Sequence, residues 1–366
     1  MILLGSPGTG KSTVMLTGFT AFYNYVAAMG ATISFDAPSD EAQMKHLNGR
    51  YWAGQMPSPT KEGWRQSIKL ALEFPTDAYE TTHFVFTDIP GEVAARSLTE
   101  EGSDPAVLRI LKNAETVIFF FDLSIEPCIR EKLINGDEEK TWKPMQDNYI
   151  RLSQSRQNRA EVSQLQLLQK LLQDLRSQKG DRLKNTNFIC VVPKADLFVS
   201  EEGDGQFFLT PLYQFLQNQQ VLVASRHYQT DSFAGLSSLI GTGSKLAPNQ
   251  NVADQKQIAT QISQTSMKCL QNIGDALGDD PDSQPLKMAL NQVLKVRLID
   301  NLFHTFGQDN VYFLPVSAQG ENGRPSEEGN NGSVKLGHPP NQKLSEYVFV
   351  LPIALCAEQI SASKQR

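Results

Sequence analysis

Short runs of apolar residues recur along the chain and predict six strands, at residues 2–4, 68–74, 84–88, 116–122, 187–192 and 311–316. Most runs are almost continuously apolar, which is typical of strands covered on both faces of a sheet. Helix-compatible stretches separate most of them, and this spacing favours parallel neighbours joined by crossovers. The runs at 68–74 and 84–88 lie too close together for a crossover. A hairpin there would make the second strand antiparallel.

Two of the intervening segments carry apolar residues at helical spacing, which favours helices that face a core. One stripe comprises Val162, Leu165, Leu168, Leu172 and Leu175, and the other comprises Leu286, Leu290, Val293, Leu294 and Phe303. The pattern therefore predicts an α/β protein of three layers. Helices cover both faces of a mostly parallel sheet with one antiparallel strand.

Two stretches are longer than this sheet requires and are predicted to be insertions, at residues 124–160 and 197–310. The second is expected to be helical, because polar and apolar residues alternate at helical spacing after residue 254. Residues 321–341 are rich in Gly, Asn, Pro and Glu, which predicts a flexible loop. The whole chain, residues 1–366, is expected to form a single domain.

Composition and charge exclude several classes of protein. The 366 residues contain 34 Lys+Arg and 40 Asp+Glu, so the net charge of −6 gives no reason to expect nucleic-acid binding. No apolar stretch reaches the length of a transmembrane helix. The opening residues run directly into a glycine-rich loop and leave no room for a signal peptide. Four scattered cysteines without metal-ligand spacing complete the expectation of a cytoplasmic protein.

The glycine-rich loop after the first strand matches G-x-x-x-x-G-K-[ST], the phosphate-binding P-loop. Its glycines allow successive backbone N–H groups to point at phosphate oxygens, and the following helix adds its positive end. Lys11 is expected to reach the β- and γ-phosphates, and the Ser12 hydroxyl to bind Mg²⁺. The predicted phosphate-binding residues are Gly5, Ser6, Pro7, Gly8, Thr9, Gly10, Lys11, Ser12 and Thr13. A P-loop NTPase fold follows, although the loop also resembles that of AAA+ ATPases.

Residues near the γ-phosphate are predicted around two later segments. Asp88 ends an apolar strand and is followed three residues later by Gly91, which suits a Mg²⁺-linked carboxylate and an N–H donor to the γ-phosphate. Thr60 follows a proline-stiffened loop ahead of a strand, where its hydroxyl would complete the Mg²⁺ coordination.

Two further strand ends suit recognition of a guanine base. Lys194 and Asp196 follow the strand at 187–192, where the carboxylate can accept hydrogen bonds from guanine N1 and the 2-amino group. The Lys194 stem can lie along the purine ring. Ser317 and Ala318 follow the last strand and can offer a backbone N–H to guanine O6.

These five elements, in this order, resemble the translation-factor-related (TRAFAC), Ras-like class of P-loop GTPases. The segments Gly-Gln-Met-Pro-Ser-Pro-Thr and Asp-Ile-Pro-Gly-Glu resemble, more specifically, the bacterial double-GTPase type of domain. The resemblance implies bound GTP or GDP with Mg²⁺. Two departures stand out: Pro193 replaces the usual Asn of the base motif, and Glu92 stands where relatives carry a water-orienting Gln.

The leading hypothesis is a GTP-binding switch that hydrolyses GTP slowly, with Lys11, Thr60 and Glu92 as catalytic residues. An unidentified protein effector or activator, or self-association, would complete its site. One alternative is a nucleotide-regulated scaffold with little turnover. The other is an AAA+-like ATPase, although the Asp-Glu pair of that class is missing after the strand at 84–88.

Overall fold

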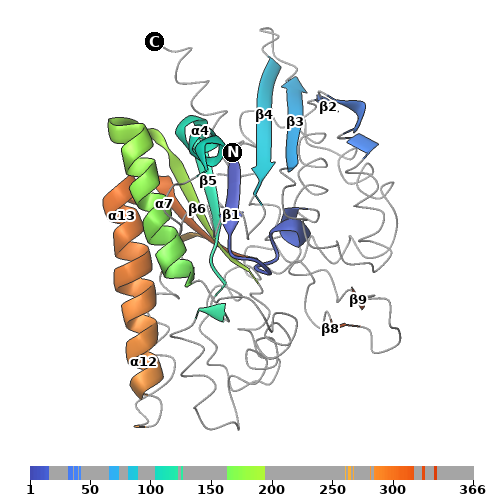
Figure 1. Ribbon diagram of the computed structural model, residues 1–366. Coiled ribbons are helices and arrows are strands. Elements are labelled where there is room, and N and C mark those ends of the chain that lie inside the picture. Colours follow the sequence, from blue (N-terminus) through green and yellow to red (C-terminus); the bar gives the residue numbers. More distant parts are fainter. Residues whose placement is uncertain are drawn as a thin grey trace, which may run out of the picture.

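The computed structural model describes residues 1–15, 32–35, 37–39, 41–42, 66–73, 81–89, 104–122, 125–126, 163–193, 260, 263–264, 267, 281, 284–316, 324–325 and 334–335. Their centre is a seven-stranded sheet with the order β2-β3-β4-β1-β5-β6-β7 (Figure 1). The strands are β1 (Ile2–Gly5), β2 (Thr32–Phe35), β3 (Gln66–Glu73), β4 (Thr81–Asp88), β5 (Thr116–Phe120), β6 (Asn187–Pro193) and β7 (Val311–Val316).

Five of these strands are parallel, since β1 pairs in parallel with β4 and β5, β5 with β6, and β6 with β7. The hairpin expected between residues 68 and 88 corresponds to β3 and β4, which pair antiparallel from Gln66↔Asp88 to Glu73↔Thr81. The outermost strand, β2, is antiparallel to β3. The predicted α/β class with a mostly parallel sheet is confirmed.

Strand β2 is absent from the hydrophobic pattern, which predicts six strands where the sheet has seven. Its four residues, Thr32–Phe35, alternate polar and apolar side chains over too short a length to indicate a strand. Pairing with β3, from Thr32↔Glu73 to Phe35↔Leu70, supplies the hydrogen bonds that make this segment a strand.

Helices cover the sheet on both faces. Helices α4 (Pro105–Asn113) and α7 (Gln164–Lys179) and the helical run before β7 connect strands that progress in one direction across the sheet. Right-handed crossovers therefore place them on one face, and α4 contacts α7. Because β2 lies on the other side of β1 in the sheet, a right-handed connection from β1 to β2 would place the helix that begins at Lys11 on the opposite face. None of the helices in the described part of the chain is long and apolar enough to cross a membrane.

Helix α7 confirms the first predicted stripe. Ser163 caps its N-terminus, and Gly180, with φ +52°, ends it before the short 3₁₀ helix η2 (Gly180–Asn185). The buried apolar residues of α7 are Leu165, Leu167, Leu168, Leu171, Leu172 and Leu175. Val162 lies outside the described residues.

The second predicted stripe lies on a helical run that is not uniformly α-helical. It comprises α12 (Gln284–Leu290), the π-helical segment η7 (Asn291–Asp300) and α13 (Asn301–Phe306), and leads through the short 3₁₀ helix η8 (Gln308–Asn310) into β7. In η7 the buried residues form two pairs, Val293–Leu294 and Leu298–Ile299, which are five positions apart. Such positions differ by about 140° on an α-helix, whereas the wider π-helical turn brings them toward one side. Of the predicted stripe, the Leu286 and Leu290 side chains lie outside the described part.

Aromatic rings join this helical run to the sheet. The Phe306 ring lies 4.9 Å from that of Phe188 in β6, and the Phe303 ring meets that of Phe313 in β7 edge-on at 6.4 Å. Phe188 also contacts Phe119 of β5, with ring centroids 6.3 Å apart. The core therefore continues from the centre of the sheet to the helices on this face.

The outer edge of β7 is covered by a residue of the long stretch between β6 and β7. Ser263 is 5% exposed, and its Oγ accepts a hydrogen bond of 2.9 Å from the Phe313 backbone N–H. Pro315, two residues further along the same edge, has no N–H to offer. Both features reduce the capacity of this edge to pair with another strand.

Replacing Ser263 with alanine is expected to lower the free energy of unfolding by about 1–2 kcal/mol, because the buried Phe313 N–H loses its acceptor. The measurement is the urea midpoint of unfolding. The exposed neighbour Gln264 provides the control, since Gln264→Ala leaves this hydrogen bond intact. Equal midpoints for the two variants would show that Ser263 does not stabilise the edge.

The predicted insertions and the predicted flexible loop are described only in small part. Ile125 and Glu126 represent the first insertion, and a few helical residues around Ser263 represent the second. Within residues 321–341, β8 (Arg324–Pro325) and β9 (Val334–Lys335) form a short antiparallel pair. The single-domain organisation and the flexibility of this loop stay predictions.

Candidate functional site

The carboxyl ends of four strands that carry predicted site residues meet at one edge of the sheet. Register places Leu3 of β1 opposite Asp88, and Gly5 opposite Phe120 of β5. Further along, Phe120 pairs with Val191, and Pro193 at the end of β6 pairs with Val316 at the end of β7. In open parallel sheets, this edge is where ligands bind.

The loop that follows β1 begins with a tight turn, Ser6-Pro7-Gly8-Thr9. The Thr9 N–H donates to the Ser6 carbonyl at 3.4 Å, and Gly8 has φ +75°. Proline at the second position and a positive-φ glycine at the third are typical of a type II turn. The Thr9 hydroxyl, fully buried, reinforces the turn by donating to the same carbonyl at 2.9 Å. The loop is thus shaped by its own sequence.

Gly5 lies where the loop leaves the sheet, and nothing larger fits there. A Cβ on Gly5 would lie 2.9 Å from both Cβ and the carbonyl oxygen of Phe120, and 3.2 Å from the Thr9 hydroxyl. Its φ of +152° is also rarely adopted by other residues. Close packing against β5 therefore fixes the position of the loop over the central strands.

The Lys11 side chain folds back beneath the loop. The residue is 7% exposed, and its ammonium group donates to the Gly5 carbonyl at 2.8 Å and to the Ser6 carbonyl at 3.1 Å. These contacts hold a positive charge beside the loop backbone. An anion bound by the loop would therefore meet a cation that is already oriented.

The helix after the loop begins at Lys11. The Val14 N–H donates to the Gly10 carbonyl at 2.9 Å, which makes Gly10 the residue before the first turn, and its φ is +83°. The N–H groups of Lys11, Ser12 and Thr13 consequently point toward the start of the helix, as anion-binding loops require. The predicted phosphate-binding residues from Gly5 to Thr13 thus lie together in one turn-and-helix unit.

The other predicted site residues are only partly within the described chain. Asp88 is the last residue of β4, although its side chain is not among those described. Outside the described residues lie Thr60, Gly91, Glu92, Lys194, Asp196, Ser317 and Ala318. The last four directly follow, or nearly follow, the ends of β6 and β7, and those ends are at the site edge.

A buried polar cluster at the end of β5 is not anticipated by the motifs. The Gln164 side-chain amide accepts from the Asp122 N–H at 2.8 Å and donates to the Asp122 carbonyl at 2.6 Å. Glu126, 2% exposed, accepts from the Ser163 hydroxyl at 2.8 Å and from the Gln164 N–H at 3.0 Å. The cluster joins the chain leaving β5 to the start of α7. The one sequence signal for this cluster was Asp122, a polar residue directly after the apolar run at 116–121.

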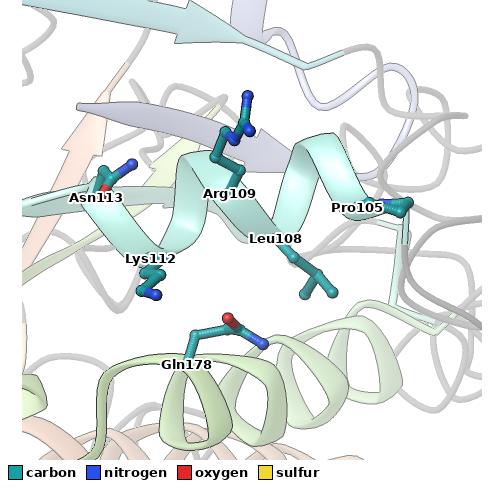
Figure 2. Close-up of a pocket in the computed structure, with 6 residues that line it drawn as sticks. All are labelled: Pro105, Leu108, Arg109, Lys112, Asn113 and Gln178. Carbon is teal, nitrogen blue, oxygen red and sulfur yellow. The ribbon is translucent and has the colours of Figure 1, made fainter.

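A surface groove between α4 and α7 is a separate feature (Figure 2). It is lined by Pro105, Leu108, Arg109, Lys112, Asn113 and Gln178. In Figure 2, Lys112 and Gln178 point into the gap, whereas Arg109 points away from α7. Lys112 and Gln178 lie near the ends of their helices, from which the chain enters β5 and β6. That end of the groove is at the opposite side of the sheet from the loop.

The described residues are better suited to bind a phosphate group than to hold a metal ion through several His, Cys, Asp or Glu side chains. Three positive-φ glycines and the oriented Lys11 ammonium group form a cradle for an anion, and the buried Ser6 Oγ has no hydrogen-bond partner among the described residues. No group of three or more His, Cys, Asp or Glu residues in the described ranges could hold a metal ion. Burial raises the pKa of the Cys190 thiol in β6, which disfavours the reactive thiolate form.

In a comparison with protein families, the chain matches the family model described as Double-GTPase 2 over residues 2–239. No curated protein and no solved structure matches the chain. The matched region begins at β1 and includes the phosphate loop, β4 and β6, and β7 completes the same sheet beyond it. With this match over more than half of its length, the chain belongs to the Double-GTPase 2 family.

Proposed function

We propose that this protein is a GTP-binding molecular switch that hydrolyses GTP slowly in a Mg²⁺-dependent reaction. Membership of the Double-GTPase 2 family indicates GTP binding and hydrolysis in general terms. One observation supports the finer proposal most strongly: the phosphate loop and the ends of β4, β6 and β7 lie at one edge of one sheet. A single nucleotide can therefore contact all of them.

The phosphate half of the site is assigned to the loop and the end of β4. The backbone N–H groups of residues 8–13 bind the phosphate oxygens, and Lys11 bridges the β- and γ-phosphates. Ser12, Asp88 and Thr60 are the proposed Mg²⁺ ligands, with Asp88 acting directly or through water. When bound, the ion neutralises charge that develops on the phosphate oxygens. Gly91 offers its N–H to the γ-phosphate.

Hydrolysis is proposed to depend on Thr60 and Glu92 in addition to Lys11. Glu92 would orient the attacking water, but a carboxylate also brings negative charge toward the γ-phosphate, so intrinsic turnover should be slow. A protein partner that supplies a positive charge would accelerate it. Loss of the γ-phosphate would then release the segments around Thr60 and Glu92, which is the proposed basis of switching.

The base half of the site is assigned to the segments after β6 and β7. Neighbouring strands lie roughly 4.8 Å apart, so β6 and β7 are about 10 and 14 Å from β1 across the sheet. This separation is comparable with the extent of a nucleotide from its phosphates to its base. Asp196 would bind the guanine N1–H and 2-amino groups, Lys194 would cover the ring, and Ser317–Ala318 would meet O6.

The base assignment is tested by competition against a fluorescent GTP analogue. We expect GDP and GTP to displace the analogue and ATP to fail at similar concentrations. Asp196→Asn should reduce the preference for GTP over ATP at least tenfold, because the amide has one acceptor oxygen where the carboxylate has two. The phosphate contacts should remain. Equal competition by ATP in the wild-type protein, or unchanged preference in the variant, would refute the assignment.

Single-turnover hydrolysis separates the switch from a nucleotide-regulated scaffold, which binds GTP with little turnover. The same experiment with cell extract added reveals a partner that accelerates cleavage. The family match favours either GTP-dependent role over the AAA+-like ATPase alternative.

A further inference from the structure

Ser6 has a backbone carbonyl that accepts several hydrogen bonds and a side-chain hydroxyl that makes none with the described residues. Its carbonyl accepts from the Thr9 hydroxyl at 2.9 Å, the Lys11 ammonium group at 3.1 Å and the Thr9 N–H at 3.4 Å. Its hydroxyl, on a residue that is 3% exposed, has no hydrogen-bond partner among the described residues. Within that part of the chain, it is the one buried side-chain oxygen or nitrogen in this condition.

Three other buried hydroxyl groups of the described chain do have hydrogen-bond partners. Thr9 donates to Ser6, Thr305 donates to the Asn301 carbonyl at 2.7 Å and accepts from Arg176 at 2.6 Å, and Ser263 accepts from Phe313. A buried donor without a partner lowers stability, because the unfolded chain hydrogen-bonds it to water. A role in ligand binding would account for retaining it in this loop.

We propose that the Ser6 hydroxyl is a phosphate-binding donor that hydrogen-bonds a phosphoryl oxygen of the nucleotide, in addition to the backbone N–H groups of the loop. This inference rests on the proposed function. The Lys11 ammonium group donates to the Ser6 carbonyl at 3.1 Å, so Ser6 lies beside the cation that is proposed to bind the phosphates. A single torsion, χ1, moves the serine oxygen and the hydroxyl hydrogen rotates freely, so the hydroxyl can turn toward a phosphoryl oxygen while the turn keeps its shape.

The proposal predicts effects of opposite sign on stability and on binding. In protein prepared without nucleotide, Ser6→Ala removes the unsatisfied donor and should raise Tm by roughly 2 °C. The same variant should bind GDP and a non-hydrolysable GTP analogue about tenfold more weakly, since a hydrogen bond to a charged oxygen is lost. Thermal unfolding measures the first effect and calorimetric titration with Mg²⁺ present measures the second.

Two further variants make the comparison specific. Thr305→Val removes a buried hydroxyl that has partners and lies outside the site, so it should lower Tm and leave nucleotide affinity unchanged. Ser6→Cys keeps a weak donor of similar size and should bind with intermediate affinity. Inorganic phosphate as a second titrant shows whether the phosphoryl oxygen alone is enough; weaker binding of phosphate by Ser6→Ala would support the proposal.

The outcomes separate this inference from the function on which it rests. If Ser6→Ala lowers Tm and keeps wild-type affinity for nucleotide, the hydroxyl has a structural partner within the chain and the inference is wrong. If the wild-type protein binds none of the nucleotides, the proposed function itself fails.

Discussion

Replacing Lys11 with methionine is expected to weaken GTP and GDP binding by roughly 10²–10³-fold. The ammonium group, held at 2.8 Å from the Gly5 carbonyl and 3.1 Å from the Ser6 carbonyl, is the group that we propose binds the phosphates. Charge-assisted hydrogen bonds contribute about 1.5–3 kcal/mol each, so losing contacts to two phosphates, each taken near the lower end of this range, costs about 3–4 kcal/mol. Methionine retains most of the buried apolar stem, so the protein should stay folded. Calorimetric titration with GDP and Mg²⁺ measures the loss.

Lys179 offers a matched control for this substitution. Its ammonium group also binds a backbone carbonyl, that of Ala114, and donates to the Thr186 hydroxyl at 3.0 Å. Burial lowers its pKa, with Glu115 opposing the shift. Lys179 lies near the start of β6, at the amino-terminal ends of the parallel strands, whereas the loop lies at their carboxyl ends. Lys179→Met should therefore change stability and leave nucleotide affinity intact. Equal losses of affinity in the two variants would contradict a specific role for Lys11.

Gly5→Ala should cost about 3–5 kcal/mol of the free energy of unfolding and abolish nucleotide binding in the protein that remains folded. The new Cβ would lie 2.9 Å from two atoms of Phe120, inside normal contact distance, on a backbone with φ +152°. Overpacking against a strand costs roughly 1–3 kcal/mol, and backbone strain adds a similar amount. Because Phe120 is fully buried in the central sheet, the loop has to move rather than the strand. Urea unfolding measures the stability.

Gly307 provides the comparison, because it has φ +83° and a Cβ added there would meet no atom of the described chain within 4 Å. Gly307→Ala therefore carries backbone strain without overpacking and should cost about 1–2 kcal/mol. Its distance in sequence and its place after α13 leave the phosphate loop undisturbed, so GDP affinity should stay at the wild-type value. Similar urea midpoints for the two variants would show that contact with Phe120 is not what constrains Gly5.

Local sequence was sufficient to predict the phosphate loop. The turn depends on Pro7 and Gly8, and the start of the helix depends on Gly10, all within a few residues of one another. The central strands were also predictable, because a continuous apolar run such as Thr116 to Phe120 is stable only between two covering layers. Family membership confirms the double-GTPase resemblance in its general form. The residues predicted after β6 and β7 stay predictions.

Features that depend on distant neighbours were missed. Strand β2 exists through its pairing with β3, more than thirty residues later in the chain, and its own four residues carry little signal. The π-helical turns of η7 bring two buried apolar pairs, five positions apart, toward one side of the helix, and the α-helical spacing assumed from the sequence does not indicate such turns. Gln164 reaches Asp122 across 42 residues of sequence, so no local pattern could indicate their hydrogen bonds.

The sequence by itself determined the chemistry that the loop can perform, since a glycine-rich turn followed by Lys11 and Ser12 is complete within eight residues. Tertiary structure decided where that chemistry operates. Parallel pairing brings the ends of β4, β6 and β7 to the same edge as the loop, although they are separated by up to about three hundred residues. Packing against Phe120 made Gly5 indispensable, and burial left the Ser6 hydroxyl without a partner in the described part of the chain. These features depend on atoms from distant segments that come together when the central sheet is buried. No local stretch of the sequence encodes such contacts.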